Sequence, residues 1–185
     1  MKLILLGIGV TVVFLFGAAI FWWYTTKSFS PENSLEFQDV DVHISVAYNR
    51  PFKKGRVIFG GLVPYGKTWR TGANEATVFE TDKDLLVNGK KLAKGKYSLW
   101  TVPNEQTWQV IFNAIIPPWG IDVMKNGEAA RDPNGIEVVV EIPVVISPKQ
   151  IEQFTITVEK AGDSMELVLL WDQTLIAVPF SINEQ

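Results

Sequence analysis

From residue 35 onward, apolar and polar residues alternate with a period of two, and this alternation constrains the fold more than any other feature of the chain. In the segment 40–48 the apolar members are Val40, Val42, Ile44, Val46 and Tyr48. A period of two places alternate side chains on opposite faces of a β-strand, so this segment predicts a strand with one buried face. The chain is therefore expected to fold mainly as β-sheet.

Similar patterns predict further strands, and turn sequences separate them. Strands are expected at residues 56–59, 76–81, 85–87, 96–102, 107–112, 136–142, 151–159, 165–171 and 175–182. Turns are expected at Asn88-Gly89, Lys94-Gly95, Pro103-Asn104, Ala161-Gly162-Asp163 and Asp172-Gln173. Asn-Gly is the strongest of these signals, because a type I′ turn needs positive φ at both central residues. One short turn of helix is expected within residues 122–131. About ten short strands predict an all-β domain over residues 36–183, an antiparallel, jelly-roll-like β-sandwich.

The N-terminal segment is a separate unit. No charged residue occurs from Leu3 to Tyr24, and a helix of that length, about 33 Å, crosses a hydrocarbon core of about 30 Å. A secretory signal has an apolar core of only about 7–15 residues before a small-residue cleavage site. Here the apolar run continues past Gly17-Ala18-Ala19 and ends in Trp22-Trp23-Tyr24, where an interfacial aromatic belt would lie. We predict an uncleaved transmembrane helix at residues 1–24, which contacts the membrane through residues 3–24, and a polar tether at 25–35.

The charges that flank this segment predict its orientation. Lys2 and the amino terminus precede the apolar run, whereas Lys27 follows it with Glu32 and Glu36 beyond. By the positive-inside rule this arrangement favours a cytoplasmic N-terminus. The protein is therefore expected to be a single-pass membrane protein with an extracytoplasmic β-domain.

The composition excludes several classes of site. Because the chain has no cysteine, it has no disulfide, no thiolate zinc site and no catalytic thiol. His43 is the only histidine, and no Gly-x-Ser-x-Gly motif is present. The net charge of −3 gives no general attraction to nucleic acid. We expect no metal, no cofactor and no nucleic-acid partner, and we favour binding over catalysis.

Residues 61–68, GLVPYGKT, have the spacing of a nucleotide-binding P-loop. A P-loop points consecutive backbone N–H groups at phosphates and is followed at once by a helix. Here Pro64 lacks an N–H, bulky Tyr65 precedes the second glycine, and the residues that follow do not predict a helix. We therefore expect no nucleotide at this segment.

The segment between Asp41 and Glu75 is nevertheless the best candidate for a site, because it contains six basic residues and five glycines but no acid. The candidate ligand-binding residues are Arg50, Arg56, Tyr65, Trp69, Arg70, Asn74 and Glu75. A tryptophan beside an arginine can stack on a flat ligand while the guanidinium holds an anionic group at two points. We expect these residues to surround one concavity, with Glu75 orienting an arginine. In the competing interpretation Arg70 and Glu75 form a purely structural pair.

Several motifs in residues 47–113 occur together in one known family. They are Leu-Val-Pro-Tyr-Gly, Trp-Arg-Thr-Gly-Ala-Asn-Glu-Ala-Thr, Gly-Lys-x-Leu and Gly-x-Tyr-Ser-Leu. This run resembles the bacterial family called domain of unknown function 2911, with looser matching to about residue 182. The resemblance implies an exported or membrane-linked β-rich protein without an assigned activity, and it brings no catalytic residues.

Three functions are compatible with these observations. The first is a tethered binding module for a small anionic or carbohydrate ligand. The second is an envelope scaffold, which should expose a contiguous apolar patch larger than a few hundred Å². The third is a hydrolase whose two carboxyl groups, about 5–10 Å apart, are brought together only by the fold.

Overall fold

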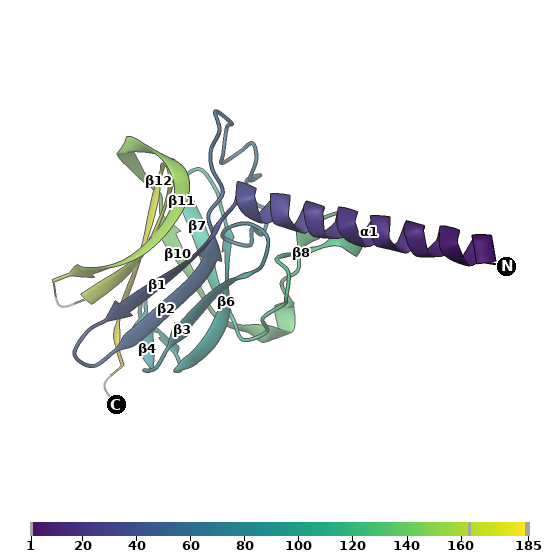
Figure 1. Cartoon of the computed structure of the whole chain (residues 1–185). Coiled ribbons are helices and arrows are strands. Elements are labelled where there is room, and N and C mark those ends of the chain that lie inside the picture. The colour runs from purple at the N-terminus through teal and green to yellow at the C-terminus, as the bar shows by residue number, and fades with distance from the viewer. Residues whose placement is uncertain (1, 163, 184–185) are drawn as a thin grey trace.

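The computed structural model describes residues 2–162 and 164–183, with the side chains of residues 2–10, 23 and 24 outside the description. One long helix, α1 (Lys2–Phe29), projects away from a β-domain that contains the remaining elements (Figure 1). Within the described residues, the segment from Thr11 to Phe29 is long and apolar enough to span a membrane. Of the predicted aromatic belt only Trp22 is described, and its side chain is exposed.

The β-domain is built on two antiparallel sheets. The first has the order β1-β2-β3-β6-β7-β10, and its strands are β1 (Glu32–Gln38), β2 (His43–Asn49), β3 (Thr77–Thr81), β6 (Gly95–Val102), β7 (Thr107–Asn113) and β10 (Ile136–Pro143). The second has the order β11-β12-β4-β5, with β11 (Val145–Ala161), β12 (Ser164–Ile182), β4 (Leu85–Val87) and β5 (Lys90–Leu92). A small hairpin of β8 (Ile121–Asp122) and β9 (Glu128–Ala129) forms a separate two-stranded sheet. The short 3₁₀ turns are η1 (Val123–Lys125), between β8 and β9, and η2 (Pro133–Gly135), which follows β9.

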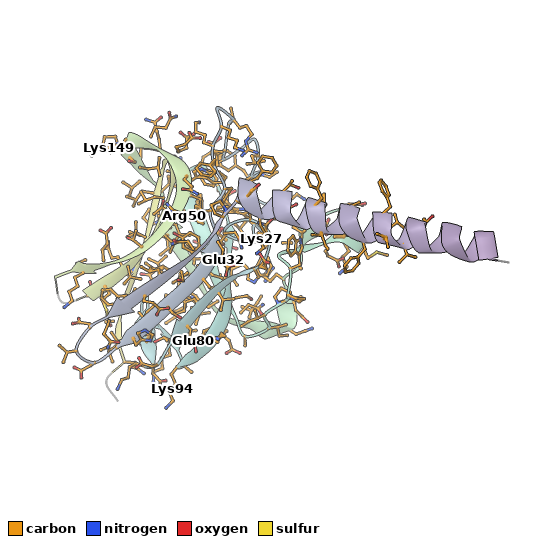
Figure 2. All side chains as sticks on the ribbon, in the orientation of Figure 1. Lys27, Glu32, Arg50, Glu80, Lys94 and Lys149 are labelled. Carbon is orange, nitrogen blue, oxygen red and sulfur yellow. The ribbon has the colours of Figure 1, made fainter. Side chains whose placement is uncertain are left out.

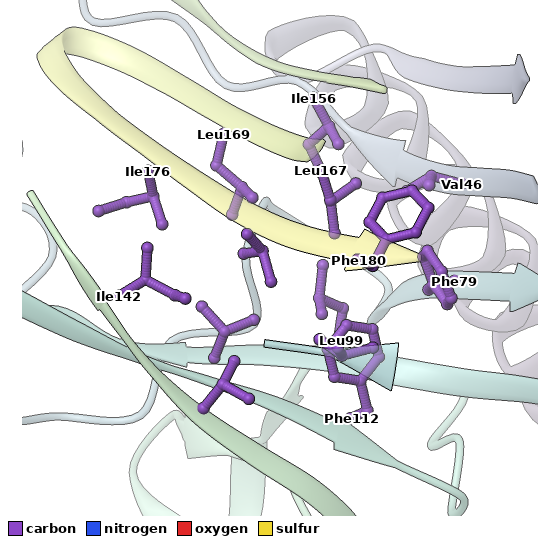
Figure 3. Close-up of a cluster of buried hydrophobic side chains, with 14 of the residues drawn as sticks. Val46, Phe79, Leu99, Phe112, Ile142, Ile156, Leu167, Leu169, Ile176 and Phe180 are labelled. Atoms are coloured by element: carbon purple, nitrogen blue, oxygen red, sulfur yellow. The ribbon is translucent and has the colours of Figure 1, made fainter. Parts of the chain in front are cut away.

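The core lies between the two sheets, as expected for a sandwich. Figure 3 shows side chains of the first sheet, such as Phe79 and Phe112, facing Leu167 and Phe180 of β12. All four belong to one cluster of buried side chains. The period-two alternation therefore has the predicted cause, since one face of each strand is removed from water.

Several expected turns are confirmed by their backbone geometry. Asn88 and Gly89 have φ of 44° and 77°, and they join β4 to β5, whose register pairs Val87 with Lys90. Both central residues have the positive φ that a type I′ turn requires. The turn between β11 and β12 contains Gly162 with φ of 65°, while Asp163 lies outside the described residues. The expected short helical turn corresponds to η1.

Two strand predictions and one turn prediction were wrong in detail. Val40 lies in the turn before β2 and is 90% exposed, because the Asp39 carboxylate accepts a hydrogen bond from the Val40 amide at 2.8 Å and closes the turn. Residues 56–59 form a turn and not a strand: Ile58 is buried while Val57 points outward. Asp172-Gln173 does not separate two strands, because β12 continues through it.

At Asp172 the chain bends without leaving the sheet. This residue has φ of 54°, and the register of β11 against β12 shifts on both sides of the Ile151–Asp172 pair. Its carboxylate accepts hydrogen bonds from Lys53 Nζ at 2.7 Å and Gln150 Nε2 at 2.8 Å. A bulge held by these contacts therefore replaces the expected turn.

The segment predicted as a tether at residues 25–35 contains regular structure. Helix α1 continues to Phe29, and β1 begins at Glu32 and pairs with β2. Between them the Arg50 amide donates to the Pro31 carbonyl at 2.9 Å. The helix thus enters the β-domain through only two residues outside regular structure, Ser30 and Pro31.

Candidate functional site

Trp69 contacts both sheets of the sandwich. Its backbone exchanges two hydrogen bonds with Thr101 of β6, at 2.7 and 3.0 Å. Its indole stacks on Trp171 of β12, with ring centroids 5.8 Å apart and an interplanar angle of 18°. Edge contacts join it to Trp108 of β7 and Phe154 of β11. Aromatic packing between the sheets therefore determines where the next residue, Arg70, can lie.

The loop that follows Trp69 has an unusual backbone conformation. Thr71, Gly72 and Asn74 have φ of 55°, 155° and 57°, and positive φ is a genuine outlier for a β-branched residue such as Thr71. Hydrogen bonds enforce the conformation: Trp69 Nε1 donates to the Gly72 carbonyl at 3.0 Å, and Thr77 Oγ1 donates to the Thr71 carbonyl at 2.7 Å. Strain that the surroundings enforce in this way is common at functional sites.

The Arg70 guanidinium is held in the protein without a partner. It forms no hydrogen bond or ion pair with any described residue, and its Nε is buried. Gly120, which precedes the β8–β9 hairpin, packs against its aliphatic part so closely that a Cβ at position 120 would overlap the Arg70 side chain. Burial lowers the pKa of Arg70 from its ordinary value, because the charged form loses hydration. A partly buried guanidinium whose N–H groups have no acceptor in the protein can donate them to an anion.

A cavity of about 500 Å³ opens beside Arg70. Its lining residues come from the end of α1, the loop after β2, the Trp69 loop and β12; they are Phe29, Ser30, Pro51, Lys54, Arg56, Leu62, Val63, Trp69, Arg70, Gly72, Ala73 and Trp171. Three of these side chains are cationic, and no Asp or Glu occurs among the described residues that line the cavity. The cavity volume falls in the range of about 300–1,000 Å³ typical of small-molecule sites.

The other two cations of the cavity are held in place by local contacts. Arg56 donates to the backbone carbonyls of Phe52 and Lys53. Lys54 Nζ lies 4.4 Å from the centre of the Phe29 ring, above its face. Neither side chain forms an ion pair within the described part of the chain. Their positive charge therefore adds to that of Arg70.

Asn74 and Glu75 do not line the cavity, but they connect the Trp69 loop to the end of α1. Glu75 pairs with Lys27 and accepts a hydrogen bond from Asn49 Nδ2 at 3.0 Å, while Asn74 Nδ2 donates to the Ser30 carbonyl at 3.4 Å. Burial raises the pKa of Glu75, but the Lys27 and Asn49 hydrogen bonds outweigh it, and the pKa lies below its ordinary value. Figure 2 shows Lys27 near the junction of α1 and the β-domain.

The expected contact between Glu75 and an arginine is absent among the described residues, both as a ligand-orienting pair and as a structural Arg70–Glu75 pair. The reason is that Lys27, at the end of α1, occupies the carboxylate. The other two candidates also lie apart from the cavity. Arg50 donates to the Phe154 carbonyl at 3.0 Å and to Thr155 Oγ1 at 2.8 Å, and so joins β2 to β11. Tyr65 packs over Gly60 and is 40% exposed.

The structure thus brings Arg56, Trp69 and Arg70 together in one cavity. Sequence reasoning missed Lys54, Gly120 and the contribution of Phe29. Lys54 stands next to Gly55 in the basic segment, so its charge was a usable signal. Gly120 and Phe29 are distant in sequence from that segment, and only the fold brings them to Arg70.

The segment 61–68 continues into the Trp69–Thr101 bridge and not into a helix, so the arrangement that a P-loop requires does not form here. No group of three or more His, Cys, Asp or Glu residues that could hold a metal occurs among the described residues.

A family model described as Protein of unknown function (DUF2911) matches residues 30–180. The chain belongs to this family. The match confirms the resemblance, which is strongest in residues 47–113 and looser to about residue 182, and it covers nearly the whole β-domain. The DUF2911 segment begins at Ser30, directly after α1, so the Trp69–Glu75 loop and most of the cavity lining belong to it. No curated protein and no solved structure matches the chain.

Close packing at Gly72 gives a testable prediction about the Trp69–Glu75 loop. A Cβ at Gly72 would lie 2.9 Å from the Asn49 carbonyl oxygen and 3.1 Å from Thr77 Oγ1. Gly72→Ala is therefore expected to lower the free energy of unfolding by more than about 3 kcal/mol, from backbone strain and steric overlap together. Denaturant unfolding of the full chain in an uncharged detergent, followed by tryptophan fluorescence, measures this.

Gly89→Ala is the matched control. Gly89 also has positive φ, but nothing lies within 4 Å of a Cβ there, so only the backbone cost of about 1–2 kcal/mol is expected. Equal losses in the two variants would show that the loop has room at Gly72 and would contradict the packing described here.

Proposed function

We propose that this DUF2911 protein is a membrane-tethered β-sandwich that binds a small anionic ligand in the cavity beside Arg70. The main observation in support is that the Arg70 guanidinium is partly buried and has no partner among the described residues. Leaving a buried cation unpaired costs free energy. An anion that accepts two N–H groups of the guanidinium would offset this cost and supply the missing hydrogen bonds.

The charge of the cavity supports an anion in particular. Arg70, Arg56 and Lys54 provide three positive charges, and the described lining residues provide no carboxylate to neutralise them. A hydrolase of the two-carboxylate type would need acids in the same cavity. The geometry therefore favours binding over hydrolysis at this site.

The aromatic residues favour an anion over a neutral sugar. A sugar-binding site presents an open ring face, whereas Trp69 is 9% exposed and Trp171 is 1% exposed. Both indoles are occupied with each other and with the core. They act as a rigid wall that orients Arg70, which pre-organises the site.

The decisive comparison is Arg70→Lys against the original chain, because lysine keeps the charge but loses the two-pronged geometry. In an uncharged detergent, inorganic phosphate and glycerol 3-phosphate are expected to raise the melting temperature of the full chain. The increase should be at least several-fold smaller in Arg70→Lys. Thermal unfolding across a concentration series of each anion measures this, since a ligand stabilises by RT ln(1 + [L]/Kd).

Arg70→Met separates binding from structure. Because Arg70 forms no ion pair with a described residue, its removal leaves no carboxylate unpaired. Arg70→Met is expected to match or exceed the original stability without ligand and to give no response to phosphate. If it instead costs about 3–5 kcal/mol, the value for breaking a buried ion pair, Arg70 has a structural role and the proposed function is wrong.

We further propose that α1 stays on the mature protein as its anchor, with the β-domain outside the cytoplasm. Support comes from the uncharged run that continues past Ala19 and from the contact of Lys27 with Glu75, which ties the helix to the β-domain. Mass spectrometry of the membrane-extracted protein should find the segment before residue 20. A mature N-terminus near Ala19 or Ile20 would show that the segment is a cleaved signal.

Labelling intact cells with a membrane-impermeant lysine reagent tests the orientation and should modify lysines of the β-domain. Complete protection of these lysines would show the opposite orientation.

A further inference from the structure

The cavity beside Arg70 lies directly at the end of the helix α1. Phe29, the last residue of α1, and Ser30, the next residue, form part of its wall. Two contacts fix this wall to the loop that carries Arg70: the Lys27–Glu75 ion pair and the hydrogen bond from Asn74 to the Ser30 carbonyl. The distance from the helix end to Arg70 is therefore set by the fold and does not depend on a flexible linker.

If α1 is the membrane anchor, as proposed above, the end of α1 sets where the cavity lies relative to the bilayer. The inference therefore rests on the proposed function. The uncharged run ends at Tyr24, and the last turns of α1 contain the polar residues Thr25, Thr26, Lys27 and Ser28. Polar residues at the end of an apolar helix lie at the headgroup level of a bilayer. The cavity wall at Phe29 and Ser30 then stands at the membrane surface, where phosphate groups are the most abundant anions.

We propose that the cavity takes the phosphate group of an anionic phospholipid from the membrane that α1 spans. A phosphodiester carries one negative charge and two free oxygens, which match two N–H groups of the Arg70 guanidinium. Lys54 and Arg56 repel a cationic headgroup and attract an anionic one. The apolar part of the wall, from Phe29, Leu62 and Val63, faces the hydrocarbon portion of the lipid.

The exposure of the wall agrees with a lipid and not with a fully enclosed ligand. Leu62 is 45% exposed and Phe29 is 60% exposed, so apolar surface continues from the cavity towards the outside at the helix end. A soluble phosphate would leave this surface in water, whereas an acyl chain covers it. The shared chemistry of both ligands is the phosphate ester, and lipid binding adds the apolar contact.

Native mass spectrometry of the full chain in a maltoside detergent distinguishes the sources of phosphate. One arm adds phosphatidylglycerol, a second adds phosphatidylcholine, and a third adds glycerol 3-phosphate. We expect one bound phosphatidylglycerol per chain, at least about tenfold tighter than either other ligand, which corresponds to about 1.4 kcal/mol. Arg70→Lys is expected to weaken phosphatidylglycerol binding about tenfold or more. Lys54→Met, at an exposed residue that leaves the loop intact, should weaken it in the same direction.

Lys94→Met is the matched control, because it removes one exposed cation at the end of the β-domain away from Lys27 and α1 (Figure 2). It should leave phosphatidylglycerol binding unchanged. If glycerol 3-phosphate binds as tightly as the lipid, the ligand is a soluble phosphate, which overturns the lipid assignment but keeps the anion site. If Lys94→Met weakens binding as much as Arg70→Lys, the attraction is a general surface effect and the lipid assignment is wrong. If no ligand binds in any arm, both this inference and the proposed function fail.

Discussion

The position of the Trp69 indole between the two sheets is the constraint on which the candidate site depends. The ring stacks on Trp171 and has edge contacts to Trp108 and Phe154, so it belongs to the core and not to a ligand surface. Its backbone is fixed at the same time by β6 through Thr101. The Trp69 ring and backbone fix where the Arg70 backbone lies, and Gly120 packs against the aliphatic part of the Arg70 side chain. In this position the Arg70 guanidinium has no partner among the described residues.

Two features of the Trp69–Glu75 loop lower the stability of the fold, and both are consistent with a binding site. Thr71 has a backbone conformation that β-branched residues rarely adopt, and the Arg70 charge loses part of its hydration. A loop selected only for stability would place glycine or asparagine at position 71 and an apolar residue at position 70. Hydrogen bonds from Trp69 and Thr77 hold the strained conformation. A ligand phosphate would offset the loss of hydration directly.

The sheet was predictable from local pattern, whereas the site was predictable only in part. Alternation identified β2 because Ile44, Val46 and Tyr48 all face one core. Asn88-Gly89 identified the turn between β4 and β5, because the required φ values suit these residue types. The pattern could not show that Glu75 pairs with Lys27, since that pairing depends on how α1 meets the β-domain. For the same reason the pattern could not show that Arg50 binds β11 through Phe154 and Thr155 and so lies outside the cavity.

The most direct test of this account is the distance between the Arg70 guanidinium and phosphorus in a bilayer. The chain has four arginines, so ¹⁵N-arginine labelling with ¹⁵N–³¹P dipolar recoupling in phosphatidylglycerol-containing liposomes gives few signals, and Arg70→Lys assigns the one of interest. The account predicts strong dephasing of the Arg70 signal, which indicates a guanidinium in direct contact with phosphate. An Arg70 signal without dephasing, in liposomes where the protein is inserted and folded, would contradict it.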